Sequence, residues 1–115
     1  MKTLGWNCQG LLSRRAVRVL QVILRQLQPN VAFLSETHLN KAKAETLMRK
    51  LGFHSMLISE SDGRSGGLLL LVKKEVKITQ RSVSNQHIDV TVDDGQTWRF
   101  TGIYGEPDWN HKDRT

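Results

Sequence analysis

Three side chains with oxygen atoms stand at the ends of segments that have the composition of β-strands. Asn7 ends KTLGWN (2–7), Glu36 follows VAFLS (31–35), and Tyr104 ends TWRFTGIY (97–104). The carboxyl ends of strands are where ligand-binding groups collect in α/β sheets. Amide and carboxylate oxygens suit a hard cation such as Mg²⁺, and a phenol can donate to a phosphate oxygen. Asn7 and Glu36 are therefore candidate metal ligands, and Tyr104 is a candidate phosphate-binding residue.

Each of these residues also has a structural interpretation that the sequence leaves open. Glu36 can simply begin a solvated loop. Asn7 can serve as a turn residue before Gln9 and Gly10. Tyr104 can be a strand aromatic whose hydroxyl group reaches water. Asn7 and Glu36, at the ends of the first two strands, are stronger evidence for a ligand site together than either residue is alone.

The remaining residues with reactive side chains do not form a recognisable metal motif. The four histidines, at positions 38, 54, 87 and 111, lack a spacing such as HExxH. His38 reads as a surface residue and His87 as a hydrogen-bonding residue at a strand start. Gly66 and Gly67 precede LLLLV, where glycines serve a turn, a bulge or a close backbone approach.

The elements that would position the candidate residues follow from caps and periodicity. Ser13 can cap a helix over 14–28 that Pro29 ends, and Asn40 can cap a second helix that Gly52 stops. A strand, a helix and a second strand in this space form a βαβ unit with parallel strands. The side chains of Asn7 and Glu36 should then emerge at the same edge of the sheet.

After residue 52 the hydrophobic period changes from helical to alternating. Five segments are strand candidates, most of them antiparallel: FHSMLIS, GLLLLV, VKITQRSV, HIDVTV and TWRFTGIY. The continuous apolar run LLLLV predicts a central strand that is buried on both faces. The expected fold is α/β: βαβα and then about five strands in a mixed sheet with helices on one face. We expect the other apolar face to stay uncovered, which favours poor solubility and self-association.

Composition places the chain among ordinary globular domains with a basic surface. It has 115 residues, 38% of them hydrophobic, and a formal net charge of +6. Glu36 is the first acidic residue, and Lys2 and four arginines precede it. Four more basic residues lie between positions 41 and 50. This balance favours a polyanionic partner, nucleic acid first. The single Cys8 and the absence of a signal peptide predict a reducing compartment, nucleus or cytoplasm.

Four motifs, taken in order, carry a resemblance to a known family. LGWNCQGL (4–11), FLSETHL (33–39), GRSGGLLLL (63–71) and FTGIYGEPD (100–108) look like the opening motifs of the endonuclease/exonuclease/phosphatase superfamily. The chain most resembles the apurinic-type endonuclease domains of plant LINE-like (non-LTR) retrotransposons. The likeness covers essentially the whole chain.

The resemblance implies a fold, an activity and a site. The family fold is a sandwich of two mixed β-sheets with helices outside, and its enzymes hydrolyse phosphodiesters with a divalent metal. By matching motifs, Asn7 and Glu36 correspond to its metal-side residues and Tyr104 to its active-site tyrosine. The implied cofactor is Mg²⁺, with Mn²⁺ as an alternative, and the implied partner is DNA, held weakly and mainly through phosphates.

The chain departs from the family pattern after Tyr104. The family's later motifs, an aspartate–asparagine pair and a terminal aspartate–histidine pair, have no match there; Asp108 and Asp113 lie in a polar tail, and no Asp precedes His111. We therefore expect residues 1–115 to be the N-terminal half of such a domain and to be inactive alone. The alternatives are a phosphomonoesterase of the same superfamily and a non-catalytic nucleic-acid-binding remnant.

Overall fold

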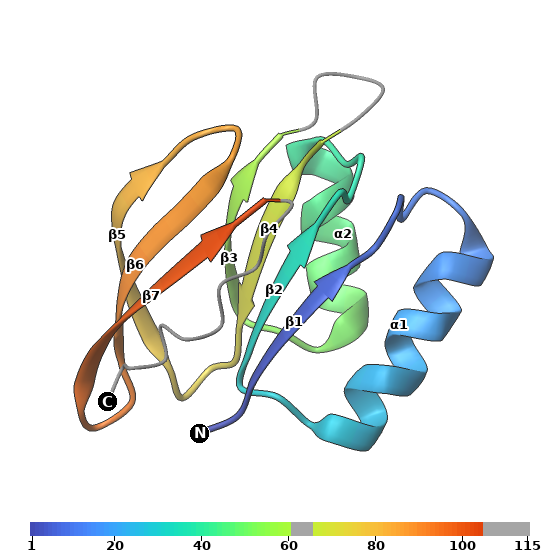
Figure 1. Ribbon diagram of the computed structural model, residues 1–115. Helices are drawn as coiled ribbons and strands as arrows, with labels where there is room; N and C mark the ends of the chain where they lie inside the picture. Colours follow the sequence, from blue (N-terminus) through green and yellow to red (C-terminus); the bar gives the residue numbers. More distant parts are fainter. Residues whose placement is uncertain (61–65, 105–115) are drawn as a thin grey trace.

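The computed structural model describes residues 1–60 and 66–104 (Figure 1). In this part of the chain two helices alternate with the first two strands, and five more strands follow. Their bounds are β1 (Thr3–Asn7), α1 (Arg14–Leu27), β2 (Val31–Ser35), α2 (Lys41–Leu51), β3 (Ser55–Ser59), β4 (Leu68–Val72), β5 (Lys77–Val83), β6 (His87–Asp93) and β7 (Thr97–Ile103). Every strand and helix predicted from the sequence is present, with ends that differ by no more than a few residues.

The first sheet has the strand order β1-β2-β4-β3. β1 and β2 are parallel, as the βαβ pattern predicts, and Asn7 lies opposite Ser35 in their register. The ends of both strands therefore meet at one edge of the sheet. β4 runs antiparallel between β2 and β3. Its five residues, LLLLV, are all buried, which confirms the prediction of a central strand.

Local side-chain chemistry starts and stops both helices. The Ser13 hydroxyl accepts a hydrogen bond from the Ala16 amide at 3.1 Å, and the Asn40 side chain accepts one from the Lys43 amide at 2.9 Å. These bonds satisfy amide groups that a helix start leaves unpaired. α2 stops at Gly52, whose φ of 82° is readily available only to glycine. α1 stops at Gln28, which takes a left-handed conformation before Pro29.

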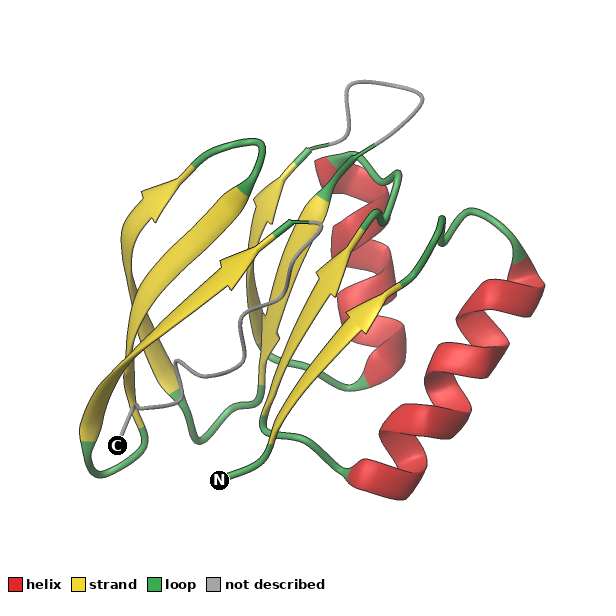
Figure 2. Ribbon diagram, in the orientation of Figure 1, coloured by secondary structure: helices red, strands yellow, loops and turns green. Residues whose placement is uncertain are grey.

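The second sheet corrects one expectation. Strands β5, β6 and β7 do not extend the first sheet but form a separate antiparallel sheet. Figure 2 shows this sheet on the side of the four-stranded sheet that faces away from the helices. The expectation that nothing in the chain covers this face was wrong. The strands turn away after Val72, so their apolar side chains face the first sheet instead of lengthening it.

The molecule consequently has two hydrophobic cores, one on each face of the first sheet. The first joins α1 and α2 to the sheet through residues such as Leu20, Leu24 and Leu34. The second joins the two sheets through residues such as Phe33, Ile88 and Phe100. The fold is an α/β arrangement in three layers, helices, sheet and sheet. No helix in the described residues is long and apolar enough to cross a membrane.

Candidate active site

The structure brings together two of the predicted site residues that are far apart in the sequence. The Tyr104 hydroxyl donates a hydrogen bond to Oε2 of Glu36 at 2.9 Å. Tyr104 follows β7 in the second sheet and Glu36 follows β2 in the first, so this bond crosses between the two layers. A phenol that donates to one carboxylate oxygen orients the carboxylate and leaves the other oxygen, Oε1, available for a ligand.

Backbone hydrogen bonds hold the loop of Glu36 on both sides. On the β1 side, the Glu36 carbonyl accepts from the Gly10 amide at 2.7 Å and the Thr37 carbonyl accepts from the Leu11 amide at 2.9 Å. On the β4 side, the Thr37 amide donates to the Gly67 carbonyl at 3.1 Å. The loop is thus fixed between the segments that follow β1 and precede β4, and it cannot move independently of them.

Two residues of this loop have left-handed backbone conformations that the sequence does not predict. Glu36 has a φ of 53° and His38 a φ of 60°. Side-chain-bearing residues rarely adopt these left-handed values, and they persist where the surroundings impose them. The loop after β1 adds a third such residue, Gln9, with a φ of 51°. Strained residues in two adjacent loops are often found at functional sites, because the surrounding structure must hold them in place.

Asn7 lies at the same edge but is not bonded to Glu36. Its side-chain oxygen accepts a hydrogen bond from the Gln9 amide at 3.2 Å. That contact is the turn role which the sequence left open, and it also holds the amide at the end of β1. Asn7 lies opposite Ser35 in the parallel register, so its backbone is next to the residue that precedes Glu36.

The charge of Glu36 affects two ionisable neighbours. Burial, with the nearby Glu36 carboxylate, raises the pKa of the Cys8 thiol to about 12. The hydrogen bond to Glu36 raises the pKa of the Tyr104 phenol, as do burial and the carboxylate charge. Both groups therefore stay protonated at neutral pH. Tyr104 acts as a donor, and the Glu36 carboxylate is the negative centre of this edge.

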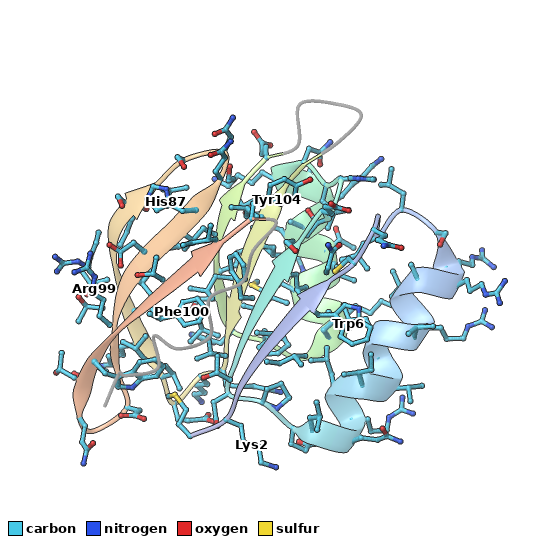
Figure 3. The ribbon with its side chains drawn as sticks, viewed as in Figure 1. Lys2, Trp6, His87, Arg99, Phe100 and Tyr104 are labelled. Atoms are coloured by element: carbon cyan, nitrogen blue, oxygen red, sulfur yellow. The ribbon has the colours of Figure 1, made fainter. Side chains whose placement is uncertain are left out.

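The histidines near this edge have structural contacts. The imidazole ring of His38 lies against Gly10, where an added Cβ would come within 3.0 Å of its Nδ1 atom. His87 pairs its two ring nitrogens with the hydroxyls of Ser82, at 2.7 Å, and Ser84, at 2.6 Å. This confirms the expected hydrogen-bonding role of His87. Figure 3 shows His87 and Tyr104 at the same end of the molecule, and the Tyr104 amide donates to the Gln86 carbonyl at 2.7 Å.

The donor set at this edge fits magnesium in its chemistry. Glu36 supplies a carboxylate and Asn7 an amide oxygen, both hard oxygen donors. Magnesium is commonly held by one or two carboxylates and keeps several of its waters. No cluster of three or more His, Cys, Asp or Glu side chains suited to a metal ion occurs within residues 1–60 and 66–104. Glu36 and Asn7 are therefore donors of the kind that could hold a magnesium ion.

The glycine pair before β4 and Cys8 also contribute to this edge. The carbonyls of Gly66 and Gly67 accept hydrogen bonds from the amides of His38 and Thr37, which is the close backbone approach that the sequence allowed for this pair. Sequence reasoning did not place Cys8 beside Glu36, although the position of Cys8 directly after Asn7 was a signal for it. The polar tail with Asp108, His111 and Asp113 lies outside the described residues, as does Ser65.

A known family resembles this chain in sequence, and known proteins resemble it in structure. The model of the Endonuclease/Exonuclease/phosphatase family matches residues 4–112. No curated protein matches the chain by sequence comparison. Solved structures do match.

An AP endonuclease from Archaeoglobus fulgidus has a TM-score of 0.68 and 17% identity, over 90% of this chain and 40% of that one. TDP2 of D. rerio, complexed with a single-strand DNA product, has a TM-score of 0.67 and 22% identity, over 96% of this chain and 48% of that one.

A third similar structure is the 3′ phosphatase NExo from Neisseria, bound to a product DNA hairpin. Its TM-score is 0.65 at 19% identity, over 98% of this chain and 47% of that one. At these identities the likeness shows the fold alone, and the chain spans less than half the length of each of these three proteins. The family model, in contrast, covers nearly the whole sequence and includes Asn7, Glu36 and Tyr104. The chain belongs to the endonuclease/exonuclease/phosphatase family.

Proposed function

We propose that this chain is the metal-binding half of a Mg²⁺-dependent nuclease domain that cuts phosphodiester bonds in DNA. The observation that carries the proposal is the hydrogen bond of 2.9 Å between Tyr104 and Glu36. It joins two residues of the family motifs that come from different sheets. They meet at the edge of the first sheet where β1 ends in Asn7. A tyrosine whose hydroxyl group only reached water would not form this hydrogen bond to the Glu36 carboxylate.

In this proposal each residue has a defined task. Glu36 and Asn7 hold Mg²⁺, and Mn²⁺ can replace it because it accepts the same oxygen ligands. Tyr104 keeps the Glu36 carboxylate in one orientation, so that the available oxygen points at the ion. The bound ion would act as a Lewis acid that stabilises negative charge on the phosphate. The raised pKa of Tyr104 keeps its proton in place while it does this.

The distribution of basic residues supports a polymeric substrate over a small phosphate ester. Both helices begin at the edge that carries Glu36 (Figure 1), and neither has an acidic residue in its first turn. Arg14 and Arg15 start α1, and Lys41 and Lys43 lie in the first turn of α2. Helix starts attract anions, and these cations add to that attraction. The DNA complexes of the TDP2 and NExo structures agree with this choice.

The retrotransposon relation and the inactivity of the isolated chain belong to the same proposal. The motifs of residues 4–11 and 33–39 support a relation to non-LTR retrotransposon endonucleases. No match to the family's aspartate–asparagine and aspartate–histidine pairs follows Tyr104, so the sequence lacks the groups expected to activate a water molecule for attack. We therefore expect the isolated chain to bind DNA without cutting it.

The decisive experiment adds the part of the family domain that these 115 residues do not span. The C-terminal segment of a complete family member is fused after Pro107, and nicking of supercoiled plasmid in Mg²⁺ is compared for the parent and for Glu36→Gln. The amide keeps the shape and the acceptor for Tyr104 but removes the charge. We expect the rate to fall on the order of 10²-fold or more, since each ~1.4 kcal/mol of lost transition-state stabilisation is tenfold. Asn7→Ala should slow cleavage less, and His38→Ala should leave it near the parent rate.

Two readouts separate the possible failures. In the isolated chain, Mn²⁺ should broaden the NMR amide signals of residues 7–10 and 35–38, and Glu36→Gln should abolish this. Equal rates of the parent and Glu36→Gln chimeras in saturating Mg²⁺ would reduce Glu36 to a loop carboxylate. A chimera that removes 3′-phosphates from an oligonucleotide but never nicks a plasmid would assign the domain to the phosphomonoesterase branch.

A further inference from the structure

A groove runs between α1 and α2 on the outer surface of the molecule. Its larger part is a cavity of about 420 Å³ that both helices line. A smaller cavity of about 210 Å³ lies between the ends of the same helices. Lys50 lines both cavities, and the two are together named here the interhelical groove. The volume of the larger part falls within the range of about 300–1,000 Å³ that is common for ligand-binding cavities.

The floor of the interhelical groove is apolar. Leu11, Leu12, Val17, Leu39 and Leu47 line the larger cavity, and Leu12 is 60% exposed to solvent. An exposed leucine at the rim of an apolar cavity keeps hydrophobic surface in water, which a protein partner can cover. A bare nucleic-acid backbone gains little from such a floor, because phosphates seek cations and hydrogen-bond donors.

The charged residues at the rim of the groove are cationic. Among the described residues that line it, the ionisable ones are Arg25, Lys43, Lys50 and Lys73, and none is acidic. Lys73 is held in place, since its Nζ atom lies 4.7 Å from the centre of the Phe53 ring and donates to the Gly52 carbonyl at 3.4 Å. Positive charge around an apolar floor complements a segment that carries apolar side chains on one side and carboxylates on the other.

We propose that the interhelical groove binds an acidic amphipathic helix of a partner protein. The partner's apolar side chains, spaced at i, i+3, i+4 and i+7, would fill the larger cavity, and its glutamates or aspartates would pair with Lys43 and Lys50. A second copy of this chain is a poor occupant, because its net charge of +6 would bring like charge to a cationic rim.

The experiment uses the full chain and a labelled synthetic peptide of about 18 residues, with leucines at helical spacing and glutamates elsewhere. Binding is followed by fluorescence anisotropy. A second peptide has the same composition in scrambled order. We expect micromolar binding of the first peptide, weaker binding at high salt, and affinity at least about tenfold lower for the scrambled peptide.

Matched variants locate the contact. Lys50→Glu and Thr46→Glu change exposed groove residues and should each weaken peptide binding about tenfold or more. Arg15→Glu and Gln26→Glu make the same charge changes on α1 outside the groove and should alter it by no more than about twofold. Thermal unfolding checks that all four variants fold, and the neutral Lys50→Gln serves if Lys50→Glu does not.

Three results would overturn the proposal. The first is equal binding of the ordered and scrambled peptides. The second is a DNA duplex that displaces the peptide and loses affinity more with Thr46→Glu than with Arg15→Glu, which would make the groove a nucleic-acid site. The third is a dimer of the chain, seen by sedimentation, that Thr46→Glu dissociates, which would make a second copy the occupant.

Discussion

Glu36 combines a charged side chain with a backbone conformation that is costly for any residue except glycine. A left-handed φ at such a residue costs on the order of 1–3 kcal/mol and survives only when the surrounding structure enforces it. Here the Gly10 amide and the Tyr104 hydroxyl, both bonded to Glu36, supply that enforcement. The strain and the bonds together fix the carboxylate before any ligand arrives, which is the property that a metal ligand needs.

The Glu36 carboxylate also affects the reactivity of the Cys8 thiol, which gives a first prediction. With its pKa raised to about 12, the thiol carries far less thiolate at pH 8 than a free cysteine, whose pKa is about 8.5. Iodoacetamide should therefore alkylate the native chain at least about 10²-fold more slowly than the chain in urea. Glu36→Gln should speed the native reaction, because it removes one of the two causes. Equal native and unfolded rates would refute the prediction.

The raised pKa of Cys8 also has a consequence for stability. The folded state holds the thiol proton more tightly than the unfolded state does. The contribution is therefore complete below the unfolded pKa of about 8.5 and is lost as pH rises from there toward 12. Urea midpoints measured between pH 7 and pH 10 should fall more for the parent than for Cys8→Ser.

Asp89 is the subject of a second prediction. Its side chain is only 8% exposed and accepts hydrogen bonds from Arg99, at 3.0 and 2.7 Å, and from Thr101, at 3.1 Å. The Arg99 bonds above all hold the pKa of Asp89 below its usual range, although burial opposes this. Asp89→Asn keeps the size but loses the charge. We expect a loss of about 1–2 kcal/mol in unfolding free energy at pH 7, because Arg99 is largely solvated.

The sign of the pH effect at Asp89 follows from the lowered pKa. Its contribution is present above the unfolded pKa of about 3.9 and disappears as pH falls below that value. Acid titration of stability should therefore bring the parent and Asp89→Asn together toward pH 2. A difference that stays constant from pH 7 to pH 2 would show that the charge is not the cause.

At the scale of elements, the packing of the two sheets depends on one glycine. Gly102 lies in β7 against the ring of Phe33 in β2, and an added Cβ would come within 2.5 Å of that ring. Phe33 also meets Phe100, with ring centres 5.8 Å apart. The sheets can approach this closely only because position 102 has no side chain. The layer that carries Tyr104 is thereby held against the layer that carries Glu36.

Gly102→Ala should accordingly destabilise the domain by about 1–3 kcal/mol, the usual cost of overpacking a core. Thermal or urea unfolding measures it, with the exposed β7 change Thr97→Ala as a control that should have little effect. Adding Phe33→Leu should recover part of the loss, since the smaller side chain makes room. If the destabilisation of the double variant equals the sum of the two single destabilisations, the added Cβ does not clash with Phe33.

At the scale of the whole molecule, the covered sheet changes what is expected of the isolated chain. Apolar side chains of both sheets are buried against each other, from Val31 to Phe100. The uncovered face that favoured self-association does not exist in the described residues. The basic surface remains, and it governs the last prediction.

The full chain should bind duplex DNA weakly, without sequence preference, and without nicking it in Mg²⁺. Because binding would rest on phosphate contacts, the logarithm of the binding constant should fall linearly with the logarithm of salt concentration. Replacing Arg14 and Arg15 with Gln should weaken binding and lower that slope by about 2. Val19→Gln and Val22→Gln on the same helix are the uncharged controls. Chelator-sensitive nicking by a clean preparation would contradict the account of an incomplete site.

The sequence alone determined the local elements, because their signals lie within a few residues of each other. Ser13 and Asn40 cap, Gly52 stops, and the runs VAFLS and LLLLV are buried strands whatever their neighbours. The parallel pairing of β1 and β2 followed as well, since a short helical connection allows little else. Asn7, Glu36 and Tyr104 could be selected because each ends such a strand.

Tertiary structure decided what depends on contacts between distant segments. Alternating patterns predicted the strands β5 to β7 but not the sheet that they join, because a strand pattern does not identify its pairing partners. The hydrogen bond between Tyr104 and Glu36 spans 68 positions, and its geometry depends on how closely Gly102 lets the sheets approach. The left-handed backbone at Glu36 is likewise imposed by two hydrogen bonds, one that the Gly10 amide donates to the Glu36 carbonyl and one that the Thr37 amide donates to the Gly67 carbonyl. No local sequence signal encodes these, because their cause is the packing of layers formed by separate parts of the chain.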